Sequence, residues 1–406
     1  MSAFNQSFSR RKFISMAGVG AAAMAVSPHL SFAAGMVDRK IRVGIIGGRF
    51  GAGFNFHEHP NCIVEAVSDL IPERREHLMK VYHCKKSYES LKKLLRDRKV
   101  EAVFIATPAP DHANHVIESL NAGKHVLCAV PAAMTLDECA AVKEAVERTG
   151  LIYMMAETSI FRQGMISVQK LYKEGKFGTM FSAASEYNHP GLEVLYFEKG
   201  KPTWRHGLPP MLYPTHCTSF LIGVTGERLT EVSCMGWGDD SPMLKNNAFK
   251  NPFWNETAFF RTNKGTPFRV EVNWKGALEE AERAEWRGDK MSFYYPTPGN
   301  KEFTIIRADD KIGRDDAGFA HTKNIMEPYS VPEWWKTDML PAPLRHNSGH
   351  EGSHTFITHE FIDAIVNSRE SSVNVYEALA FTAPGIVAHQ SALNDGESMK
   401  IPSFDK

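Results

Sequence analysis

The stretch Ile41-Arg42-Val43-Gly44-Ile45-Ile46 runs directly into Gly47-Gly48-Arg49-Phe50-Gly51-Ala52-Gly53, and this junction decides the fold. The first half is a short apolar run that predicts a buried parallel strand. A glycine-rich turn between such a strand and a helix lets the backbone approach a pyrophosphate, whose charge meets the helix N-terminus. Arg49 stands where a second glycine is usual, so the turn alone also fits a purely structural role.

Later segments place this turn in a dinucleotide-binding domain. A second predicted strand, residues 64–68, ends at Asp69, about 20 residues beyond the turn. A carboxylate there accepts hydrogen bonds from both ribose hydroxyls and repels a 2′-phosphate, so it favours NAD over NADP. The remaining elements predict a doubly wound parallel sheet over residues 37–159: strands at 102–108, 125–128 and 152–156, and helices at 72–81, 88–96, 112–122 and 136–148.

The candidate cofactor-binding residues lie in the glycine turn, at the strand ends and in the loops that follow them. They are Gly47, Gly48, Arg49, Phe50, Gly51, Asp69, Thr107, Pro108, His112 and Pro131.

Charge and cysteine content exclude several other classes of protein. Lys and Arg together number 47, as do Asp and Glu, so the formal net charge is zero. This balance argues against nucleic acid or an anionic membrane as the main partner and is compatible with a neutral sugar. The six cysteines are scattered without a C-x-x-C pair, so neither a disulfide framework nor a zinc site is expected. We interpret His57-Glu58-His59 as a helix end and predict no metal site.

The N-terminus has the composition of an export signal. Ser9-Arg10-Arg11-Lys12-Phe13-Ile14 precedes an apolar stretch at 16–26 and small residues up to Ala34. This order predicts a cleaved signal over residues 1–34 rather than a basic tail before a core helix. The apolar stretch is too short to span a bilayer comfortably, so no stable membrane insertion is expected after cleavage. The paired arginines resemble the twin-arginine motif, which implies periplasmic or other export of a folded, cofactor-loaded protein.

Residues 160–406 predict a second, α/β domain, which is expected to bind substrate and to mediate oligomers. Alternating or apolar runs predict strands at 181–188, 230–236, 257–262, 268–274 and 303–307, and a helix at 355–366. The proline-rich stretch 328–343 predicts a long ordered loop.

Several motifs resemble the Gfo/Idh/MocA oxidoreductase family over nearly all of the chain that follows the signal. They are the strand and turn at 43–47, Ala106-Thr107-Pro108, residues 122–127 and Val375-Tyr376-Glu377-Ala378. The resemblance implies an α/β fold in which a Rossmann domain precedes an α/β domain with a large, mostly antiparallel sheet. It also implies oxidation of sugars, inositols or polyols, or reduction of the ketones, and homo-oligomers formed through that sheet.

Two positions depart from the dehydrogenases of this family. Their Glu-Lys-Pro is replaced by Ala129-Val130-Pro131, and Val130 cannot transfer a proton. Leu212 stands where they carry Asp in an Asp-x-x-x-His motif, which leaves only His216.

The replacements resemble a narrower group, the NAD-dependent glycosidases of glycoside hydrolase family 109. The similar segments are Val130-Pro131-Ala132-Ala133, Met154-Met155-Ala156-Glu157, Glu186-Tyr187-Asn188-His189, Leu212-Tyr213-Pro214-Thr215-His216 and Gly349-His350-Glu351-Gly352. Two residues differ from that group's motifs: Ala129 stands in place of a glutamate and Glu351 in place of a glycine. The resemblance implies oxidation at a sugar C3, elimination of the glycosidic substituent, addition of water and return of the hydride.

The candidate catalytic residues are His216, Tyr187, His189 and Glu157, and the candidate substrate residues are Tyr213 and His350. His216 is the expected base for a hydroxyl proton, although a histidine at a helix start is also a common structural feature. Tyr187 suits removal of a C–H proton if nearby positive charge lowers its pKa, and otherwise fits packing.

The predicted function is NAD-dependent oxidation of a sugar or glycoside hydroxyl, most simply at C3. Redox-assisted glycoside hydrolysis or elimination is the alternative enzyme class. A sugar-binding module without catalysis is the remaining alternative.

Overall fold

The computed structural model describes residues 39–406. The predicted export signal at 1–34, with its paired arginines and cleavage site, lies outside the described residues.

Six parallel strands form the first sheet, sheet A, in the order β3-β2-β1-β4-β5-β6. This order confirms the predicted doubly wound sheet and places its switch point between β1 and β4, where ligands bind in such folds. The strands are β1 Ile41–Ile46, β2 Cys62–Ser68, β3 Ser87–Tyr88, β4 Ala102–Ile105, β5 His125–Cys128 and β6 Tyr153–Met155. The helices are α2 Pro72–Val81, α3 Leu91–Leu95, α4 His112–Asn121 and α5 Leu136–Thr149.

Local capping explains where these helices begin and end. Thr135 and Glu138 form a reciprocal capping box at the start of α5, and Gly150 ends it in a left-handed conformation. The helix predicted at 88–96 is partly wrong, since Tyr88 belongs to the edge strand β3 and α3 begins at Leu91. Ser90 accepts a hydrogen bond from the Lys93 N–H and therefore caps α3 there.

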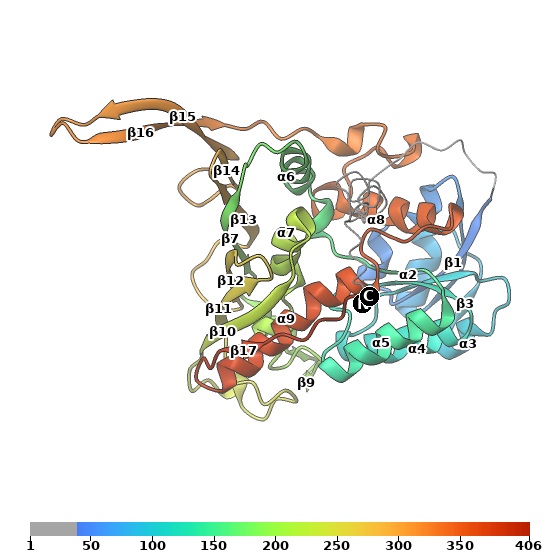
Figure 1. Ribbon diagram of the computed structural model, residues 1–406. Coiled ribbons are helices and arrows are strands. Elements are labelled where there is room, and N and C mark those ends of the chain that lie inside the picture. The colour runs from blue at the N-terminus through green and yellow to red at the C-terminus, as the bar shows by residue number, and fades with distance from the viewer. Residues whose placement is uncertain (1–38) are drawn as a thin grey trace, which may run out of the picture. The chain divides into compact units, whose positions relative to one another are not determined.

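The helix predicted directly after the glycine turn is also wrong. Two 3₁₀ helices, η1 Phe50–Gly53 and η2 Phe56–Glu58, connect β1 to β2 instead. Glycines weaken an α-helix in this stretch, and Asn55, at φ 54°, interrupts it. The helix α8, Gly349–Val366, packs against this connection, and Figure 1 shows it beside the start of the described chain.

The C-terminal part of the chain packs against the first domain in two places. The ring of His354, in α8, stacks on Phe54 in the connection after β1, with the centroids 4.1 Å apart. At the edge of sheet A, Met155 of β6 donates its N–H to the Val373 carbonyl at 3.0 Å. Both contacts join segments more than 200 residues apart in sequence.

The second sheet, sheet B, has nine strands in the order β16-β15-β14-β13-β7-β12-β11-β10-β17. All pairs are antiparallel except β7 with β12, which confirms the predicted mostly antiparallel sheet. The strands are β7 Met180–Asn188, β10 Leu229–Trp237, β11 Asn255–Thr262, β12 Pro267–Asn273, β13 Ala281–Gly288, β14 Met291–Tyr294, β15 Thr304–Arg314, β16 Ala320–Pro328 and β17 Met399–Lys400.

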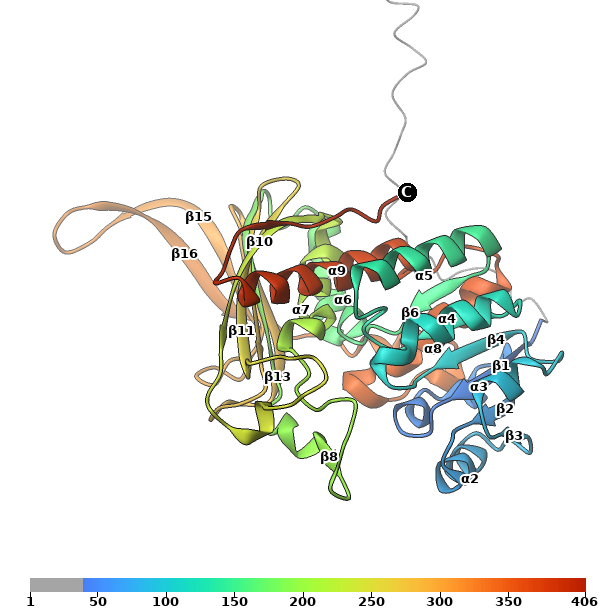
Figure 2. The same ribbon diagram turned by 90° about the horizontal axis from the view of Figure 1, so that it is seen from below.

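Helices cover one face of sheet B, as Figure 2 shows. They are α6 Gln163–Lys173, α7 Thr215–Thr225 and α9 Val375–Leu393. Trp274 and Trp286 are buried in this layer, and Trp286 donates its indole N–H to the Phe220 carbonyl of α7 at 2.9 Å. The five strands predicted in this part of the chain are present, whereas β13, β14, β16 and β17 of sheet B were not predicted.

The last two strands on one edge, β15 and β16, form a long hairpin that extends away from sheet B (Figure 1). Almost every residue of β16 is exposed. Ile312, Phe319 and Met326 on this hairpin are exposed apolar side chains. The expected loop after it does follow, with two short 3₁₀ helices, η8 Trp334–Lys336 and η9 Ala342–Leu344.

Three further features concern ligands and solvent. No helix within residues 39–406 is long and apolar enough to cross a membrane. In the same part of the chain, no group of three or more His, Cys, Asp or Glu side chains is arranged to hold a metal ion. All six cysteines are buried thiols, and His57 and Glu58 lie in the short η2 helix as predicted.

Candidate active site

A cavity of about 830 Å³ opens at the carboxyl end of sheet A. Most of the predicted cofactor-binding residues line it: Gly47, Gly48, Arg49, Phe50, Asp69, Thr107, Pro108 and His112. The lining continues into the second part of the chain through Val194, Leu195, Phe197, Glu198, Trp204, Arg205 and Tyr213. The first and second parts of the chain therefore share one cavity.

The glycine turn has the geometry that a bound pyrophosphate requires. Gly47 has φ 104°, and a Cβ at this position would lie 2.2 Å from the Ala106 carbonyl oxygen. Asp69 accepts the Gly48 N–H at 2.7 Å on Oδ2 and the Ile71 N–H at 2.8 Å on Oδ1, which ties the turn to the end of β2. The turn is therefore held close to the backbone after β4, as in dinucleotide-binding folds.

One unsatisfied polar atom also faces this cavity. The Ser68 hydroxyl is buried, lines the cavity and has no hydrogen-bond partner in the described structure. Buried hydroxyls normally have a partner, so a ligand hydroxyl or phosphate oxygen would complete this one. Together with the turn and Asp69, this atom makes the cavity suitable for a dinucleotide.

Two predicted cofactor residues lie behind the lining rather than in it. Gly51 and Pro131 are not among the residues that line the cavity. The His112 ring joins the loops that follow β4 and β5, because its Nδ1 lies 2.8 Å from the Pro131 carbonyl oxygen and its Nε2 lies 2.8 Å from that of Thr107. Val130, which replaces the family's lysine, is itself part of the cavity wall.

A small hairpin, β8 Phe197–Glu198 and β9 Lys201–Pro202, stands over the glycine turn. Glu198 forms an ion pair with Arg49 at 2.9 Å and lies 3.8 Å from Arg74. Both arginines line the cavity. These pairs are partly exposed, so each adds little stability, but together they hold the hairpin at the cavity mouth.

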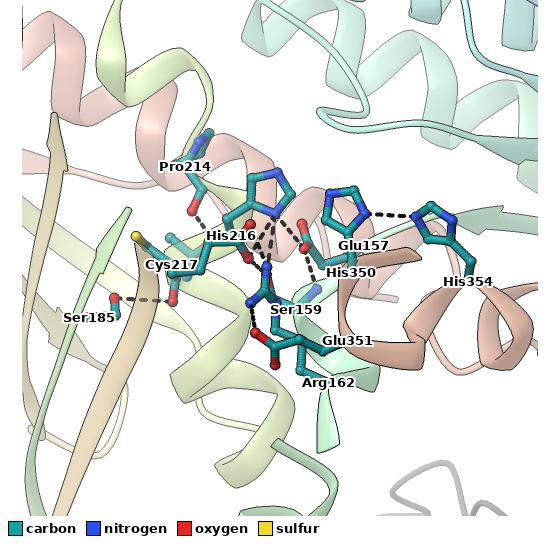
Figure 3. Close-up of polar contacts among 12 residues, drawn as sticks. Glu157, Ser159, Arg162, Ser185, Pro214, His216, Cys217, His350, Glu351 and His354 are labelled. Carbon is teal, nitrogen blue, oxygen red and sulfur yellow. Dashed lines mark hydrogen bonds and ion pairs between the residues drawn. The ribbon is translucent and has the colours of Figure 1, made fainter. Parts of the chain in front are cut away.

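The candidate catalytic residues Glu157 and His216 form a buried pair next to this cavity (Figure 3). Glu157 follows β6, and His216 lies in the first turn of α7. His216 Nδ1 donates to Glu157 Oε1 at 2.9 Å and lies 3.2 Å from the Ser159 hydroxyl. A second carboxylate, Glu282 of β13, lies 3.8 Å from the same nitrogen.

Arg162 balances part of this negative charge. Its guanidinium forms ion pairs with Glu282 at 2.9 Å and with Glu351 at 2.8 Å. The cluster thus contains three carboxylates, one guanidinium and the His216 ring. Buried carboxylates are tolerated only when they are paired, so the cluster favours a proton on His216.

The protonation of His216 differs from the sequence-based expectation. Burial alone would lower its pKa, but the carboxylates of Glu157 and Glu282 outweigh that effect and raise the pKa to about 9. For Glu157, burial alone would raise the pKa of the carboxyl, but the charge and hydrogen bond of His216 outweigh that effect and lower it. A raised pKa favours a protonated His216 ring at neutral pH, which can donate a proton, and the role of His216 as a base stays a prediction.

Two tyrosines pack beside the His216 ring. The ring centroid of Tyr187 lies 4.9 Å from that of His216, and the centroid of Tyr213 lies 5.3 Å from it. Burial raises the pKa of Tyr187 well above its usual value of 10, and it raises that of Tyr213 to about 12. The condition set for Tyr187 as a base, a pKa lowered by nearby positive charge, is thus not met.

The predicted residue His189 lies at the end of β7, close to Tyr187, with 6.1 Å between the ring centroids. Its Nδ1 is buried and has no hydrogen-bond partner in the described structure. Buried ring nitrogens normally have a partner, but His189 is not among the residues that line the cavity.

His350 lies in a strained loop at the start of α8. The φ angles of His350, Glu351 and Gly352 are 50°, 58° and 87°, a left-handed run that costs about 1–2 kcal/mol for each non-glycine residue. Arg162 holds the Glu351 side chain, and Gln163 donates to the Glu351 carbonyl at 3.1 Å. Such strain is retained where the surroundings fix it, often at functional sites.

Sequence reasoning missed Ser159, Arg162, Glu282 and the cavity-lining segment 194–205. Glu282 lies in a charge-rich stretch whose strand was not predicted, so nothing in the sequence distinguishes it from its exposed neighbours. Only the fold shows which charges are buried.

Two family matches agree with this architecture. Residues 41–157 match the Gfo/Idh/MocA oxidoreductase family, described as having an NAD-binding Rossmann fold. Residues 304–406 match the C-terminal domain of glycosyl hydrolase 109. The match at 41–157 confirms the predicted resemblance to the Gfo/Idh/MocA oxidoreductase family and the predicted NAD-binding Rossmann fold for that part of the chain.

Individual relatives connect the chain to glycosyl hydrolase family 109. A protein of this family from Solibacter usitatus is 23% identical over 97% of this chain and 96% of its own length. A 2,7-anhydro-N-acetylneuraminate hydratase from Escherichia coli is 28% identical over 50% of this chain and 57% of its own length. The levoglucosan dehydrogenase complex with NADH has the same fold, with a TM-score of 0.73, 18% identity, and coverage of 90% of this chain and 100% of its own.

Proposed function

We propose that the protein holds NAD tightly and uses it to oxidise a hydroxyl, at C3, of a sugar or glycoside. The observation that carries this proposal is that Tyr213 lines the dinucleotide cavity and packs its ring against that of His216. Bound NAD⁺ supplies a hydride acceptor. The substrate class rests on the motif resemblance and on relatives and structural neighbours named for sugars or glycosides.

The chain's own residues supply binding and proton transfer. Asp69 and the glycine turn would hold the ribose and pyrophosphate. Glu157 orients the His216 ring through Nδ1 and keeps a proton on it. His216 can therefore deliver a proton to the oxygen of a ketone when the hydride returns.

Redox-assisted glycoside cleavage is the second candidate. The observation that favours it is the 2.9 Å contact between His216 Nδ1 and the Glu157 carboxylate, which raises the pKa of the ring. Departure of a glycosidic oxygen needs a proton donor of this kind. Oxidation at C3 acidifies the C2–H bond. Loss of that proton and of the C1 substituent gives an unsaturated ketone, to which water adds before the hydride returns. The cycle has no net oxidation.

The test uses the purified holoprotein and a panel of sugars and glycosides. Lasting absorbance of reduced cofactor near ~340 nm is expected for a dehydrogenase, since hydride transfer leaves NADH. Free sugar without net reduction indicates the glycosidase. Neither signal with any compound, despite measurable binding, would leave only a sugar-binding module. The 3-deoxy analogue of each active compound is the matched control, and its oxidation would refute the assignment to C3.

Export and assembly complete the proposal. The twin-arginine signal predicts that the folded, loaded protein is exported. The open face of sheet B carries exposed Met235 and Trp237 on β10 and Phe259 on β11, whose side chains share one face by register. An exposed apolar patch of this kind supports a homo-oligomer through sheet B. Dissociation of Phe259→Asp in analytical ultracentrifugation would support this interface, and an unchanged sedimentation coefficient would count against it.

A further inference from the structure

One carboxylate from the second part of the chain lies among the cationic side chains of the cofactor cavity. Glu198 Oε1, in β8, lies 2.9 Å from Arg49 Nη2 and 3.8 Å from Arg74 Nη2. All three residues line the cavity. In Figure 2, β8 and the helix α2, which carries Arg74, lie along the same edge of the molecule. A group from the second part of the chain therefore pairs with two arginines of the dinucleotide domain.

The hairpin that carries Glu198 is fixed at its base. Tyr196, directly before β8, is fully buried and stacks on Trp254, with 5.8 Å between the ring centroids. The Thr203 N–H donates to the Tyr196 carbonyl at 2.7 Å and closes the base. A fixed support thus presents Glu198 to the arginines, although the Glu198 side chain itself is half exposed.

Arg74 stands beside the position where a ribose is expected. A Cβ on Gly48 would lie 2.7 Å from the Arg74 Cβ, so the arginine side chain begins next to the glycine turn. The N–H of the same Gly48 donates to Asp69 Oδ2 at 2.7 Å. Asp69 is the carboxylate that would accept the ribose hydroxyls. Arg74 and Asp69 therefore face the same part of a bound nucleotide.

Charge at this position decides between two cofactors, because NADP differs from NAD by a phosphate on the ribose 2′-oxygen. An arginine nearby accommodates this phosphate, whereas a carboxylate repels it. Arg75 is already occupied, since its Nη1 donates to the carbonyls of Asp69 and Leu70 at 2.8 and 3.3 Å. Arg49 and Arg74 are not, and two guanidinium groups would bind a phosphate strongly despite the single carboxylate of Asp69. Selection of NAD therefore needs a further negative charge.

We propose that Glu198 is a specificity-determining residue for the cofactor: it occupies Arg49 and Arg74, and so prevents them from binding a 2′-phosphate. This inference rests on the proposed function of the cavity as a cofactor site. It divides the selection between two distant places in the chain. Asp69 at the end of β2 repels the phosphate, and Glu198, more than 120 residues later, removes the cations that would attract it.

The first test identifies the nucleotide that each protein retains, without any turnover. Wild type and Glu198→Gln are produced in the same cells, which contain both nucleotides, and are purified and denatured. The released NAD and NADP are quantified by mass spectrometry. Glu198→Gln should raise the ratio of NADP to NAD by about 3- to 10-fold, the effect expected of two partly exposed ion pairs.

The ratio separates selection from simple retention. A looser hairpin would release both nucleotides alike and leave the ratio unchanged. Lys201→Gln is the matched control, because Lys201 is paired with Glu198 in the register of the hairpin but does not line the cavity. It should keep the wild-type ratio.

The second test removes the cations that the proposal holds responsible. Adding Arg49→Gln and Arg74→Gln to Glu198→Gln should return the ratio to that of the wild type. Salt gives an independent reading, since the screening length falls from about 10 Å at 0.1 M to about 3 Å at 1 M. Glu198→Gln should therefore lose NADP faster than NAD during gel filtration at the higher salt concentration. A triple variant that keeps the raised ratio, or equal salt effects on the two nucleotides, would contradict the role of the arginines.

The outcomes also separate this inference from the proposed function. A ratio in Glu198→Gln within about twofold of the wild type overturns the role of Glu198. Loss of both nucleotides from this variant overturns it as well, because the carboxylate would then only hold the hairpin. Wild-type protein that releases no nucleotide refutes the cofactor site, whereas protein that releases NAD but oxidises no sugar refutes the proposed reaction alone.

Discussion

Replacing Glu157 by Gln should return the proton of His216 to solvent at neutral pH. The rise of the His216 pKa from 6.5 to about 9 corresponds to roughly 3 kcal/mol in favour of the protonated ring. Glu157 is the strongest favourable contributor, both through its charge and through the 2.9 Å hydrogen bond. Burial opposes the charged ring, so without this carboxylate we expect the pKa of His216 to fall to about 7 or below, with Glu282 alone opposing burial.

The assay is an NMR titration of the His216 imidazole in the wild type and in Glu157→Gln, from pH 5 to 10. Glu285→Gln is the control, because Glu285 pairs with Arg287 on the open face of sheet B. The alkaline limb of any activity that needs the His216 proton should move to lower pH with the same variant. If His216 still titrates near pH 9 in Glu157→Gln, the carboxylate does not hold the proton and the account of the cluster is wrong.

Four further predictions concern other parts of the chain. The free energy of unfolding should fall as pH drops from 6.5 towards 4, because unfolding then adds protons to histidines that the fold keeps neutral. Burial lowers the pKa values of His59, His354 and His359 to about 3, 4 and 4. These three groups should give a slope of about 4 kcal/mol per pH unit near pH 5 in urea melts, and a slope below about 1.4 kcal/mol per pH unit, the value for one proton, would contradict this. Asp69→Ala should lose the retained nucleotide, and denaturing the wild type should release NAD, so recovery of NADP would refute the assignment of Asp69. Tyr187→Phe should still reduce its cofactor, whereas loss of solvent-deuterium exchange at the sugar C2 would support the glycosidase cycle. Lysine at both Arg10 and Arg11 should stop export, and normal secretion of that variant would remove the signal assignment.

Local patterns predicted most of the first half of the fold. The strand at Ile41–Ile46 and the helix at Pro72–Val81 have the predicted bounds, because apolar runs and caps act over a few residues. The helix expected after the glycine turn is absent for a long-range reason. The helix α8, some 300 residues later, packs against β1 where that helix would lie, and no local sequence pattern indicates such an exchange.

The candidate site shows the same division. The motifs predicted Glu157 and His216, and the structure brings them into contact. The raised pKa of His216 could not be predicted, because it needs the 2.9 Å contact with Glu157 that only the fold creates. The second contributor, Glu282, lies in a strand that the charge-rich sequence did not reveal. The position of the His354 ring likewise depends on the Gly53 carbonyl, 2.9 Å from its Nδ1, and a sequence motif does not encode such a partner.

The packing of the far end of the chain against the first domain has a consequence for synthesis. A ribosome releases β1 and the dinucleotide loop early, yet Phe54 acquires its covering ring only when α8 emerges, and β6 acquires its partner at Val373 later still. Until then the nascent first half exposes apolar surface, a state prone to aggregation. The residues that line the nucleotide cavity run from Ile46 to Tyr213, but Phe50 in its wall also packs against His354 of α8, with 5.8 Å between the ring centroids. Fragments that stop before α8 should therefore retain NAD less tightly than the whole chain, even though they contain every residue of the glycine turn.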